Sequence, residues 1–339
     1  MKYFLLNAPP TFDPARSGRD SRVKYDRKDA KAHAFAAMKG VWAAALTPFT
    51  ASGAVDEGAI AANYRHWIDD LNIDGIFVAG KQGEFFSMSL DERKRAFELA
   101  VKAADGKAQT IMSCSDQNMD VVIELARHAQ RCGADYVVVH APILHFHKAQ
   151  DETLMNYYRT VCGAVDIGVA LWSHPDSGYL MSPQLCNRLA DIENVVAIKY
   201  SVPRPMYKEL HALASDRILV STASEEEWLD NILELGWRLY LCSSPPYLIQ
   251  TKNDRRMRGY TDLAFAGKAQ EARAMRDSLA PVRHALKSTR PAEKPHAHQK
   301  YWQELLGQTG GHVRAPLLEL SEAEKRATRA AFEASGLMM

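Results

Sequence analysis

Short apolar runs alternate with amphipathic helical patterns eight times between residue 41 and about residue 255, and this alternation limits the possible folds more than any other feature. Several of the runs are continuously apolar or β-branched, which is typical of parallel strands buried on both faces. Eight strand–helix units predict a closed (β/α)8 barrel, the TIM barrel of the α/β class. The runs are, in order, Val41–Leu46, Gly75–Ala79, Thr110–Cys114, Tyr136–His140, Ile167–Trp172, Val195–Lys199, Ile218–Ser221 and Leu239–Cys242.

The segments between the runs carry helix-end signals. Ser89 stands three residues before Glu92, as in a capping box, and Gly133 follows the apolar face of another helical pattern. Ser182-Pro183 supplies a cap and a first-turn proline for a third helix. A doubly wound open sheet is the alternative fold, but the turn Leu46-Thr47-Pro48-Phe49 is unsuited to a glycine-rich phosphate loop.

Two segments flank the predicted barrel of residues 39–255. Residues 1–38 are interpreted as an N-terminal extension outside the main core, which is rich in charge from about residue 11 and helical near its end. Residues 256–339 show only helical periodicity, which predicts an appended C-terminal helical segment. The helical patterns of that segment are Tyr260–Leu286, Gln299–Leu306 and Ser321–Ala334.

Composition excludes several classes of partner. The 42 basic residues nearly match the 41 acidic ones, so there is no electrostatic case for binding nucleic acid or an anionic membrane. No apolar stretch is long enough to span a bilayer, and the patch before Pro9 is too short for a secretory signal. The five scattered cysteines lack a CxxC spacing, which favours reduced thiols in a cytoplasmic protein.

In such a barrel, chemistry takes place at the carboxyl ends of the strands. Lys199 closes the sixth run, where burial would disfavour its ammonium form and leave an amine able to attack a carbonyl. The alternative is a strand-end lysine whose head reaches water. A functional lysine is favoured because other reactive or polar residues are expected at the same end, namely Gly80 to Glu84, His140, Trp172, His174 and Ser243-Ser244.

Five segments, in register over residues 39–335, resemble the dihydrodipicolinate synthase / N-acetylneuraminate lyase family of class I aldolases. They are Gly40 to Phe49, Gly80 to Glu84 with Ser89 to Arg93, Leu171 to Pro175, Val196 to Lys199, and Val313 to Leu317. The resemblance implies that Lys199 forms an imine with a 2-oxo acid, usually pyruvate, and that an enamine then attacks or leaves an aldehyde. It also implies a homotetramer or homodimer that needs neither metal nor organic cofactor, because the imine is the electron sink.

The resemblance also implies a set of substrate-binding residues. The loop of Gly80, Lys81, Gln82 and Gly83 stands where the family binds the carboxylate of the oxo acid through hydroxyls and backbone N–H groups. Lys81-Gln82 replaces the hydroxyl pair, so the Lys81 ammonium group and the Gln82 amide would bind the carboxylate instead. The alternative is that Lys81 points to solvent. Thr47 and Ser243, at the ends of the first and eighth runs, are further candidates. Glu84 is expected to hold the loop.

The chain departs from the family at the proton-transfer position. Trp172 stands where the family has its acid/base tyrosine, and an indole N–H donates a hydrogen bond without shuttling protons. His174 is the nearest titratable replacement, and it would lie on the same side of an extended strand as Trp172. The alternative for His174 is a structural hydrogen bond beside Pro175. No metal site is predicted, since His140, His145 and His147 form only a weak pattern.

These features give three hypotheses for function. The leading one is a Schiff-base lyase or aldolase acting on a 2-oxo acid through Lys199, and the second is a hydratase or dehydratase using the same imine. The third is a non-catalytic barrel that binds a small molecule. Asp176 to Tyr179 stands where synthases have a substrate-binding arginine, which argues against dihydrodipicolinate synthesis. Apolar residues at the mouth favour a less polar aldehyde or a subunit contact; they include Phe85, Phe86, Ile143, Leu144 and Trp172.

Overall fold

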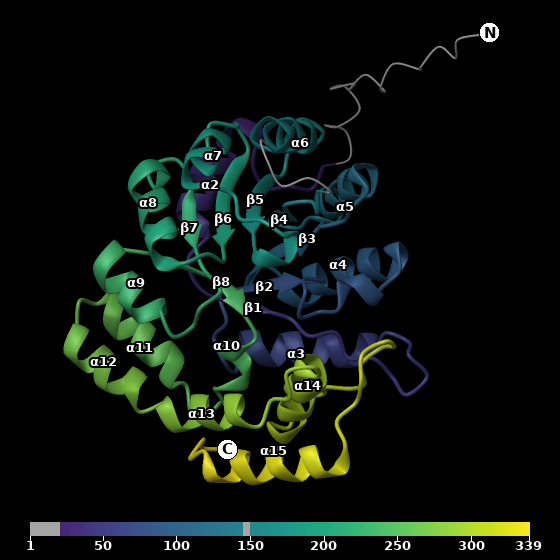
Figure 1. Ribbon diagram of the computed structural model, residues 1–339, viewed down its shortest axis with the longest axis vertical. Helices are drawn as coiled ribbons and strands as arrows, with labels where there is room; N and C mark the ends of the chain where they lie inside the picture. Colours follow the sequence, from purple (N-terminus) through teal and green to yellow (C-terminus); the bar gives the residue numbers. More distant parts are fainter. Residues whose placement is uncertain (1–20, 145–149) are drawn as a thin grey trace.

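Eight parallel strands curl into a nearly closed barrel in the computed structural model, which describes residues 21–144 and 150–339 (Figure 1). The strands are β1 Gly40–Ala44, β2 Gly75–Val78, β3 Gln109–Ser113, β4 Tyr136–His140, β5 Gly168–Ser173, β6 Val195–Tyr200, β7 Leu219–Ser221 and β8 Leu239–Ser243. All eight predicted runs therefore form strands, with ends that differ by one or two residues, and the predicted (β/α)8 barrel is confirmed.

One seam of the barrel has no backbone ladder among the described residues. The hydrogen-bonded order runs from β7 through β6 to β1 and ends at β8, so β7 and β8 lie side by side without pairing. Ser221 bridges them, because its Oγ accepts from the Leu241 N–H and donates to the Leu239 carbonyl, each at 2.8 Å. A single buried side chain thus satisfies two backbone groups of β8 that a ladder would otherwise pair.

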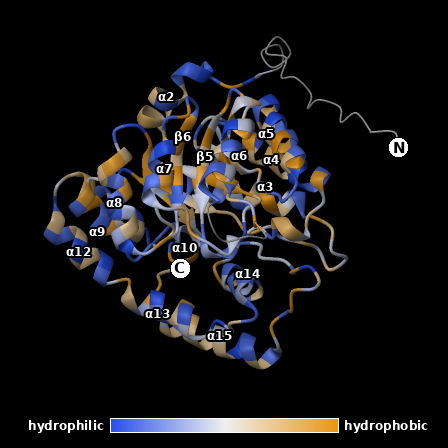
Figure 2. Cartoon of the chain, turned by 45° about the horizontal axis from the view of Figure 1, so that its top comes forward, coloured by the Kyte–Doolittle hydropathy of each residue, from blue (hydrophilic) through white to orange (hydrophobic). Residues whose placement is uncertain are grey.

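Helices surround the barrel, and their ends follow the sequence signals. They are α3 Glu57–Asp69, α4 Leu90–Ala104, α5 Met119–Cys132, α6 Asp151–Gly163, α7 Pro183–Leu189, α8 Arg204–Ala214 and α9 Trp228–Leu235. Ser89 and Glu92 form the predicted capping box of α4, and Ser182 caps α7. Helix α5 ends at Gly133, whose φ of 88° suits a residue without a Cβ. Figure 2 shows the apolar residues on β5, β6 and the inner sides of these helices.

The predicted C-terminal helices are present, and one of the predicted helical stretches contains three of them. They are α10 Pro245–Leu248, α11 Arg256–Phe265, α12 Ala269–Asp277, α13 Ala280–Ser288, α14 Pro295–Leu305 and α15 Glu322–Ala334. The single pattern Tyr260–Leu286 breaks into three helices because Gly267 adopts a φ of 76° and Pro281 begins a new first turn. The boundaries proposed at residues 38/39 and 255/256 remain a prediction.

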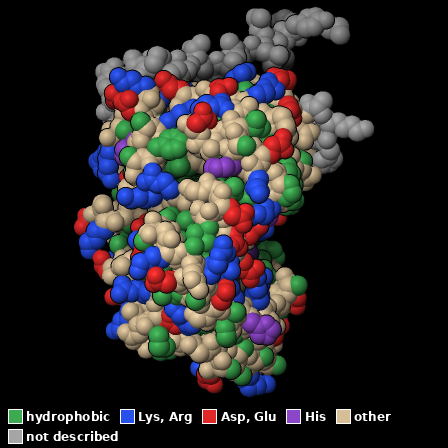
Figure 3. All heavy atoms as spheres, turned by 90° about the vertical axis from the view of Figure 1, so that its left-hand side faces the viewer, with side chains coloured by type: hydrophobic (Ala, Val, Ile, Leu, Met, Phe, Trp, Pro, Cys, Tyr) green, Lys and Arg blue, Asp and Glu red, His purple; other side chains and the backbone are tan. Residues whose placement is uncertain are grey.

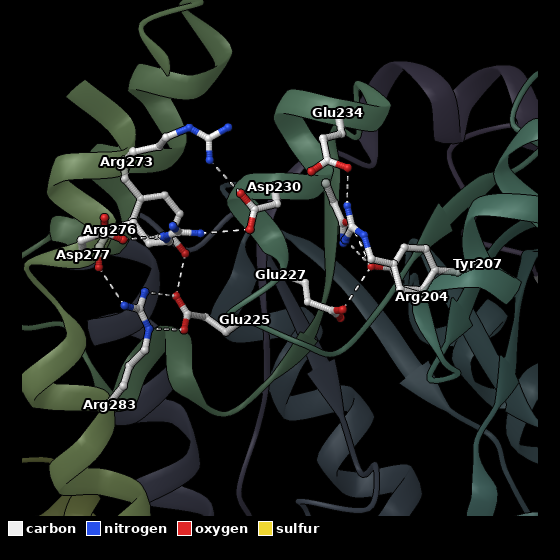
Figure 4. A network of polar contacts seen from close by, with 12 residues as sticks. Arg204, Tyr207, Glu225, Glu227, Asp230, Glu234, Arg273, Arg276, Asp277 and Arg283 are labelled. Atoms are coloured by element: carbon white, nitrogen blue, oxygen red, sulfur yellow. Dashed lines mark hydrogen bonds and ion pairs between the residues drawn. The ribbon is translucent and has the colours of Figure 1, made fainter. Parts of the chain in front are cut away.

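Ion pairs attach these helices to the barrel (Figure 4). Arg283 of α13 makes two hydrogen bonds of 2.7 Å to Glu225, which follows β7 and is buried, while Arg283 is partly buried. Tyr260 of α11 donates to the same carboxylate at 2.6 Å. Arg273 and Arg276 of α12 both contact Asp230 of α9. Basic and acidic side chains are also interspersed on the surface in Figure 3, as the balanced composition leads one to expect.

The end of the N-terminal extension belongs to the core, contrary to the sequence interpretation. Helix α2, Ala30–Ala37, lies at the amino ends of the strands, opposite α14 (Figure 1). Ala30, Ala34 and Met38 are buried with residues of the barrel interior, because their spacing of four places them on one helical face. Residues 1–20 of the predicted extension lie outside the described residues. No helix in the described ranges is long and apolar enough to cross a membrane.

Candidate active site

Lys199 lies at the carboxyl end of β6 and is 1% exposed. Its Nζ is 4.6 Å from the centre of the Phe77 ring and 4.7 Å from that of Trp172. Among the described residues, this nitrogen has no hydrogen bond or ion pair. Burial is the main cause that lowers the pKa of Lys199 below its ordinary value, because an ammonium group loses its hydration between apolar rings.

The strand register brings three of the predicted residues to one level of the barrel. His140 on β4 pairs with Trp172 on β5, and Trp172 pairs with Lys199 on β6. Side chains in register on parallel strands point the same way, so these three form a row across adjacent strands. The His140 ring meets the Trp172 ring edge-on, with centroids 4.7 Å apart and planes at 89°. We refer to these three residues as the β4–β6 row.

Trp172 stands in the middle of this row and covers the lysine. It is 3% exposed, and its ring also contacts Phe77 edge-on at 5.7 Å between centroids. The indole Nε1 is buried and has no hydrogen-bond acceptor in the described part of the chain. A buried donor without a partner is uncommon and costs about 1–3 kcal/mol, which makes it a candidate contact for a substrate oxygen.

His174 lies near Trp172, as expected, with ring centroids 6.3 Å apart. Its Nδ1 accepts the Asp176 N–H at 3.1 Å, so that the imidazole caps the short 3-10 helix Pro175–Ser177. The same nitrogen is 3.2 Å from the Asp176 carboxylate. Burial lowers the pKa of His174, and this outweighs the opposite effect of Asp176. His174 therefore makes the kind of structural hydrogen bond beside Pro175 that was the alternative to a catalytic role.

The loop after β2 is shaped by its two glycines. A Cβ on Gly80 would come within 1.9 Å of the Phe77 ring, and one on Gly83 would come within 3.0 Å of the Ala45 carbonyl. Thr47 donates its hydroxyl to the Gly83 carbonyl at 2.8 Å. Gly80 thus leaves room for the ring under Lys199, while Thr47 supports the loop.

The side chains of this loop point to different partners. Lys81 Nζ contacts Asp176 Oδ2 at 2.5 Å, which joins the loop to the segment after β5. Glu84 is fully buried and pairs with Lys300 of α14 at 2.6 Å, so it holds the loop as expected. His296 of α14 donates from Nε2 to the Lys81 carbonyl at 3.0 Å. Gln82 is half-buried, and its Oε1 has no donor among the described residues.

A cavity of about 460 Å³ opens beside the β4–β6 row. Several residues that line it were not predicted as site residues from the sequence. These residues are Ser115, Asp116 and Gln117 after β3, and Asp176 after β5. Their position just after a predicted strand is the sequence signal that could have identified them. Its other lining residues are Lys81, Phe85, Phe86, His140, Ala141, Pro142, Ile143 and Trp172. Leu144, predicted at the mouth, is not among them.

Ser243 lies apart from this cavity. It hydrogen-bonds Tyr240 Oη and lines a separate cavity of about 180 Å³ beside Glu225 and Arg283. Within the described ranges no group of three or more histidine, cysteine, aspartate or glutamate side chains is placed to hold a metal ion. His145 and His147 lie outside the described residues.

A (β/α)8 barrel with a buried amine at the carboxyl end of its sixth strand defines a class of enzymes, the lyases of the class I aldolase type. The chain belongs to the dihydrodipicolinate synthetase family, whose model matches residues 37–335. The family resemblance and the prediction of a lyase are thereby confirmed.

Individual relatives carry two different enzyme names. The chain is 28% identical over 306 residues to a 4-hydroxy-tetrahydrodipicolinate synthase of Pelobacter propionicus, covering 89% of this chain and all of that protein. An N-acetylneuraminate lyase of Clostridium perfringens is 31% identical over 165 residues, 48% of this chain and 57% of that one.

Solved structures share the fold. The dihydrodipicolinate synthase of Aquifex aeolicus superposes with a TM-score of 0.75 at 24% identity, over 88% of this chain and 98% of that one. The chloride-inhibited synthase of Acinetobacter baumannii, solved with pyruvate, gives 0.78 at 22% identity, over 89% and 100%.

Proposed function

We propose that the protein is a Schiff-base lyase or aldolase in which Lys199 forms an imine with a 2-oxo acid of the pyruvate type. The observation that carries the proposal is the Lys199 amine, buried at the end of β6 against two aromatic rings without a carboxylate partner. Such surroundings favour the neutral amine, which is the form that attacks a carbonyl. Membership of a family of class I lyases supports the same chemistry.

The loop after β2 is the proposed site for the carboxylate of the oxo acid. The backbone N–H groups of Lys81, Gln82 and Gly83 have no acceptor within the described part of the chain, whereas that of Glu84 donates to the Lys81 carbonyl. Adjacent N–H groups in a tight turn form a concave anion site. Lys81 adds a positive charge, which it shares with Asp176. Thr47 contributes by supporting the loop.

The cavity beside the row is the proposed site for the second substrate. Phe85, Phe86 and Ile143 give it an apolar wall. The nearby Arg93 guanidinium is occupied, because it bonds Asp116 and the carbonyls of Ser113 and Ser115. This favours an aldehyde of low polarity over one bearing a second carboxylate. Relatives named as synthases leave dihydrodipicolinate synthesis open, so the substrates of that reaction belong in the assay.

Reduction of the imine tests the proposal. We expect borohydride with pyruvate to add the mass of the reduced adduct to the peptide containing Lys199. Lys300 provides an internal control, since it is buried to the same 1% exposure but paired with Glu84. Its peptide should remain unmodified. Absence of an adduct at Lys199 with pyruvate and a panel of 2-oxo acids, while a proven family member reacts in parallel, would contradict the proposal.

The same experiment separates the remaining alternatives. Trapping at Lys199 without release of an aldehyde from any hydroxylated oxo acid would favour a hydratase or dehydratase. A non-catalytic binder draws support from the closure of Trp172 and Phe77 over the amine. If the protein is a non-catalytic binder, Lys199→Ala binds the ligand as tightly as the wild type does, and the wild type shows no turnover. A cytoplasmic homotetramer or homodimer remains part of the proposal.

A further inference from the structure

His140 is placed beside the proposed imine rather than on the outer rim of the barrel. It is the last residue of β4, in register with Trp172, and its ring lines the cavity proposed for the second substrate. The His140 ring and the Lys199 Nζ each lie 4.7 Å from the Trp172 ring centre. His140 and Lys199 therefore both pack against the Trp172 ring, and His140 and Trp172 line the cavity.

The hydrogen bonds of His140 fix which nitrogen carries the lone pair. Nδ1 is 2.7 Å from the Ala141 carbonyl, and since a carbonyl oxygen only accepts, Nδ1 must be the protonated nitrogen. The backbone N–H of His140 donates to Ser115 Oγ at 2.9 Å, which holds the residue in place. Nε2 has no hydrogen-bond or ion-pair partner among the described residues. Burial lowers the pKa of His140 to about 4, which keeps the ring neutral and Nε2 available as an acceptor.

The other basic groups around the cavity are occupied. His174 Nδ1 already accepts the Asp176 N–H, and the Asp176 carboxylate is paired with Lys81. Asp116 accepts from Arg93 and from the Asn118 N–H. Trp172 carries a donor but no basic lone pair.

The nearby phenols offer no base. The buried Tyr157 hydroxyl has no partner in the described part of the chain, but burial raises its pKa, so it stays a protonated phenol. Tyr179 donates its hydroxyl to the Pro142 carbonyl at 2.7 Å, and Tyr200 donates to the Met181 carbonyl at 2.5 Å. Among the described residues of the β4–β6 row and the cavity lining, Nε2 of His140 is therefore the basic nitrogen left free besides the Lys199 amine.

We propose that His140 Nε2 moves the proton at C3 of the 2-oxo acid held on Lys199, an inference that rests on the proposed function. Nε2 takes the C3 proton, the C–H electron pair becomes the C2=C3 double bond, and the cationic imine nitrogen becomes neutral. The C2=C3 pair of the enamine then forms the new bond to the carbonyl carbon of the aldehyde, and the nitrogen lone pair restores the cationic imine. The carbonyl π pair moves to oxygen, which receives the proton from His140, and cleavage follows the same steps in reverse.

Hydrogen–deuterium exchange of pyruvate tests this assignment without knowledge of the aldehyde. The full chain is incubated with pyruvate in D2O, loss of the methyl signal is followed by NMR, and imine formation is measured in parallel by borohydride trapping. His140→Phe keeps a ring against Trp172 but removes both nitrogens, and His140→Gln keeps a polar side chain without a base. We expect both variants to be trapped like the wild type while exchange falls by about 10²–10⁴-fold.

His174→Asn is the competing variant, because asparagine retains an oxygen that can cap the turn. It should lower exchange far less than the His140 variants do. Full exchange in trapped His140 variants, or an equal loss in His174→Asn, would overturn the assignment, as would a wild type that is trapped but does not exchange. A wild type that pyruvate does not label at all would overturn the proposed function, and this inference with it.

Discussion

At the scale of single residues, two buried lysines show how surroundings decide chemistry. Lys300 is as buried as Lys199, but it pairs with Glu84 at 2.6 Å and donates to the His312 carbonyl. Lys199 meets aromatic rings instead. Desolvation lowers the pKa of both, yet only for Lys300 does an adjacent carboxylate oppose it. The first arrangement suits a structural cation and the second suits a nucleophile.

The pH dependence of imine trapping should report this difference. The protonated amine cannot attack a carbonyl, so the trapping rate rises with pH until Lys199 is deprotonated and then levels off. Because burial lowers the pKa of Lys199, we expect the plateau to begin below the ordinary value of 10.5. Initial rates with pyruvate and cyanoborohydride, read at the Lys199 peptide, check this. A rate that still rises with unit slope at pH 10.5 would speak against a depressed pKa.

The residues of the site were predictable to different degrees. Lys199 and Trp172 follow directly from strand ends, because position along a parallel strand fixes the end of the barrel at which a side chain lies. Asp116 and Asp176 were missed as site residues because loops far apart in sequence meet only through tertiary packing. The tautomer of His140 depends on a single backbone carbonyl and leaves no trace in the sequence.

At the scale of elements, the strands were predicted more reliably than the helical segment after them. Apolar runs of four to six residues signal buried strands directly. The pattern Tyr260–Leu286 does not reveal the breaks between its three helices, because the apolar periodicity continues across Gly267 although the backbone turns there. The missing β7–β8 ladder had no sequence signal, since Ser221 looks like any other strand residue.

Removing the Ser221 hydroxyl should weaken this seam. Ser221→Ala leaves the Leu241 N–H and the Leu239 carbonyl without their side-chain partner in a buried place, at an expected cost of about 1–3 kcal/mol in the free energy of unfolding. Chemical denaturation measures the change. Ser201→Ala is the matched control, because the Ser201 hydroxyl is buried without a partner and its removal should cost little. If both substitutions lower the free energy of unfolding equally, the hydrogen bonds of Ser221 do not specifically stabilise the contact between β7 and β8.

At the scale of the whole molecule, segments outside the barrel pack against both of its ends. Helix α2 covers the amino ends, where His33 contacts Tyr136 at 2.7 Å and the Gly168 N–H donates to Tyr25 at 2.9 Å. At the carboxyl end, α14 and the loop after it contact the loop after β2 and the start of α4, where Arg314 bonds both oxygens of Glu92. The core role of α2 was missed because a run of charges before it masked the short apolar face.

A charge on the inner face of α2 should destabilise the whole barrel. Ala34 is fully buried, so Ala34→Asp places a carboxylate among apolar side chains, and we expect a loss of about 3 kcal/mol or more in the free energy of unfolding. Ala36 is exposed in the same helix, so Ala36→Asp should cost less than about 1 kcal/mol. Thermal unfolding of both variants makes the comparison. Similar losses would mean that α2 contributes little to the core.

The contacts between α14 and the loop after β2 have a consequence for biosynthesis. His296 and Lys300 reach Lys81 and Glu84 across more than two hundred positions of sequence. A chain that leaves the ribosome amino end first contains all eight strands before these contacts can form. Lys199 is therefore synthesised well before the loop after β2 can be secured, because that loop needs α14, which ends at Leu305.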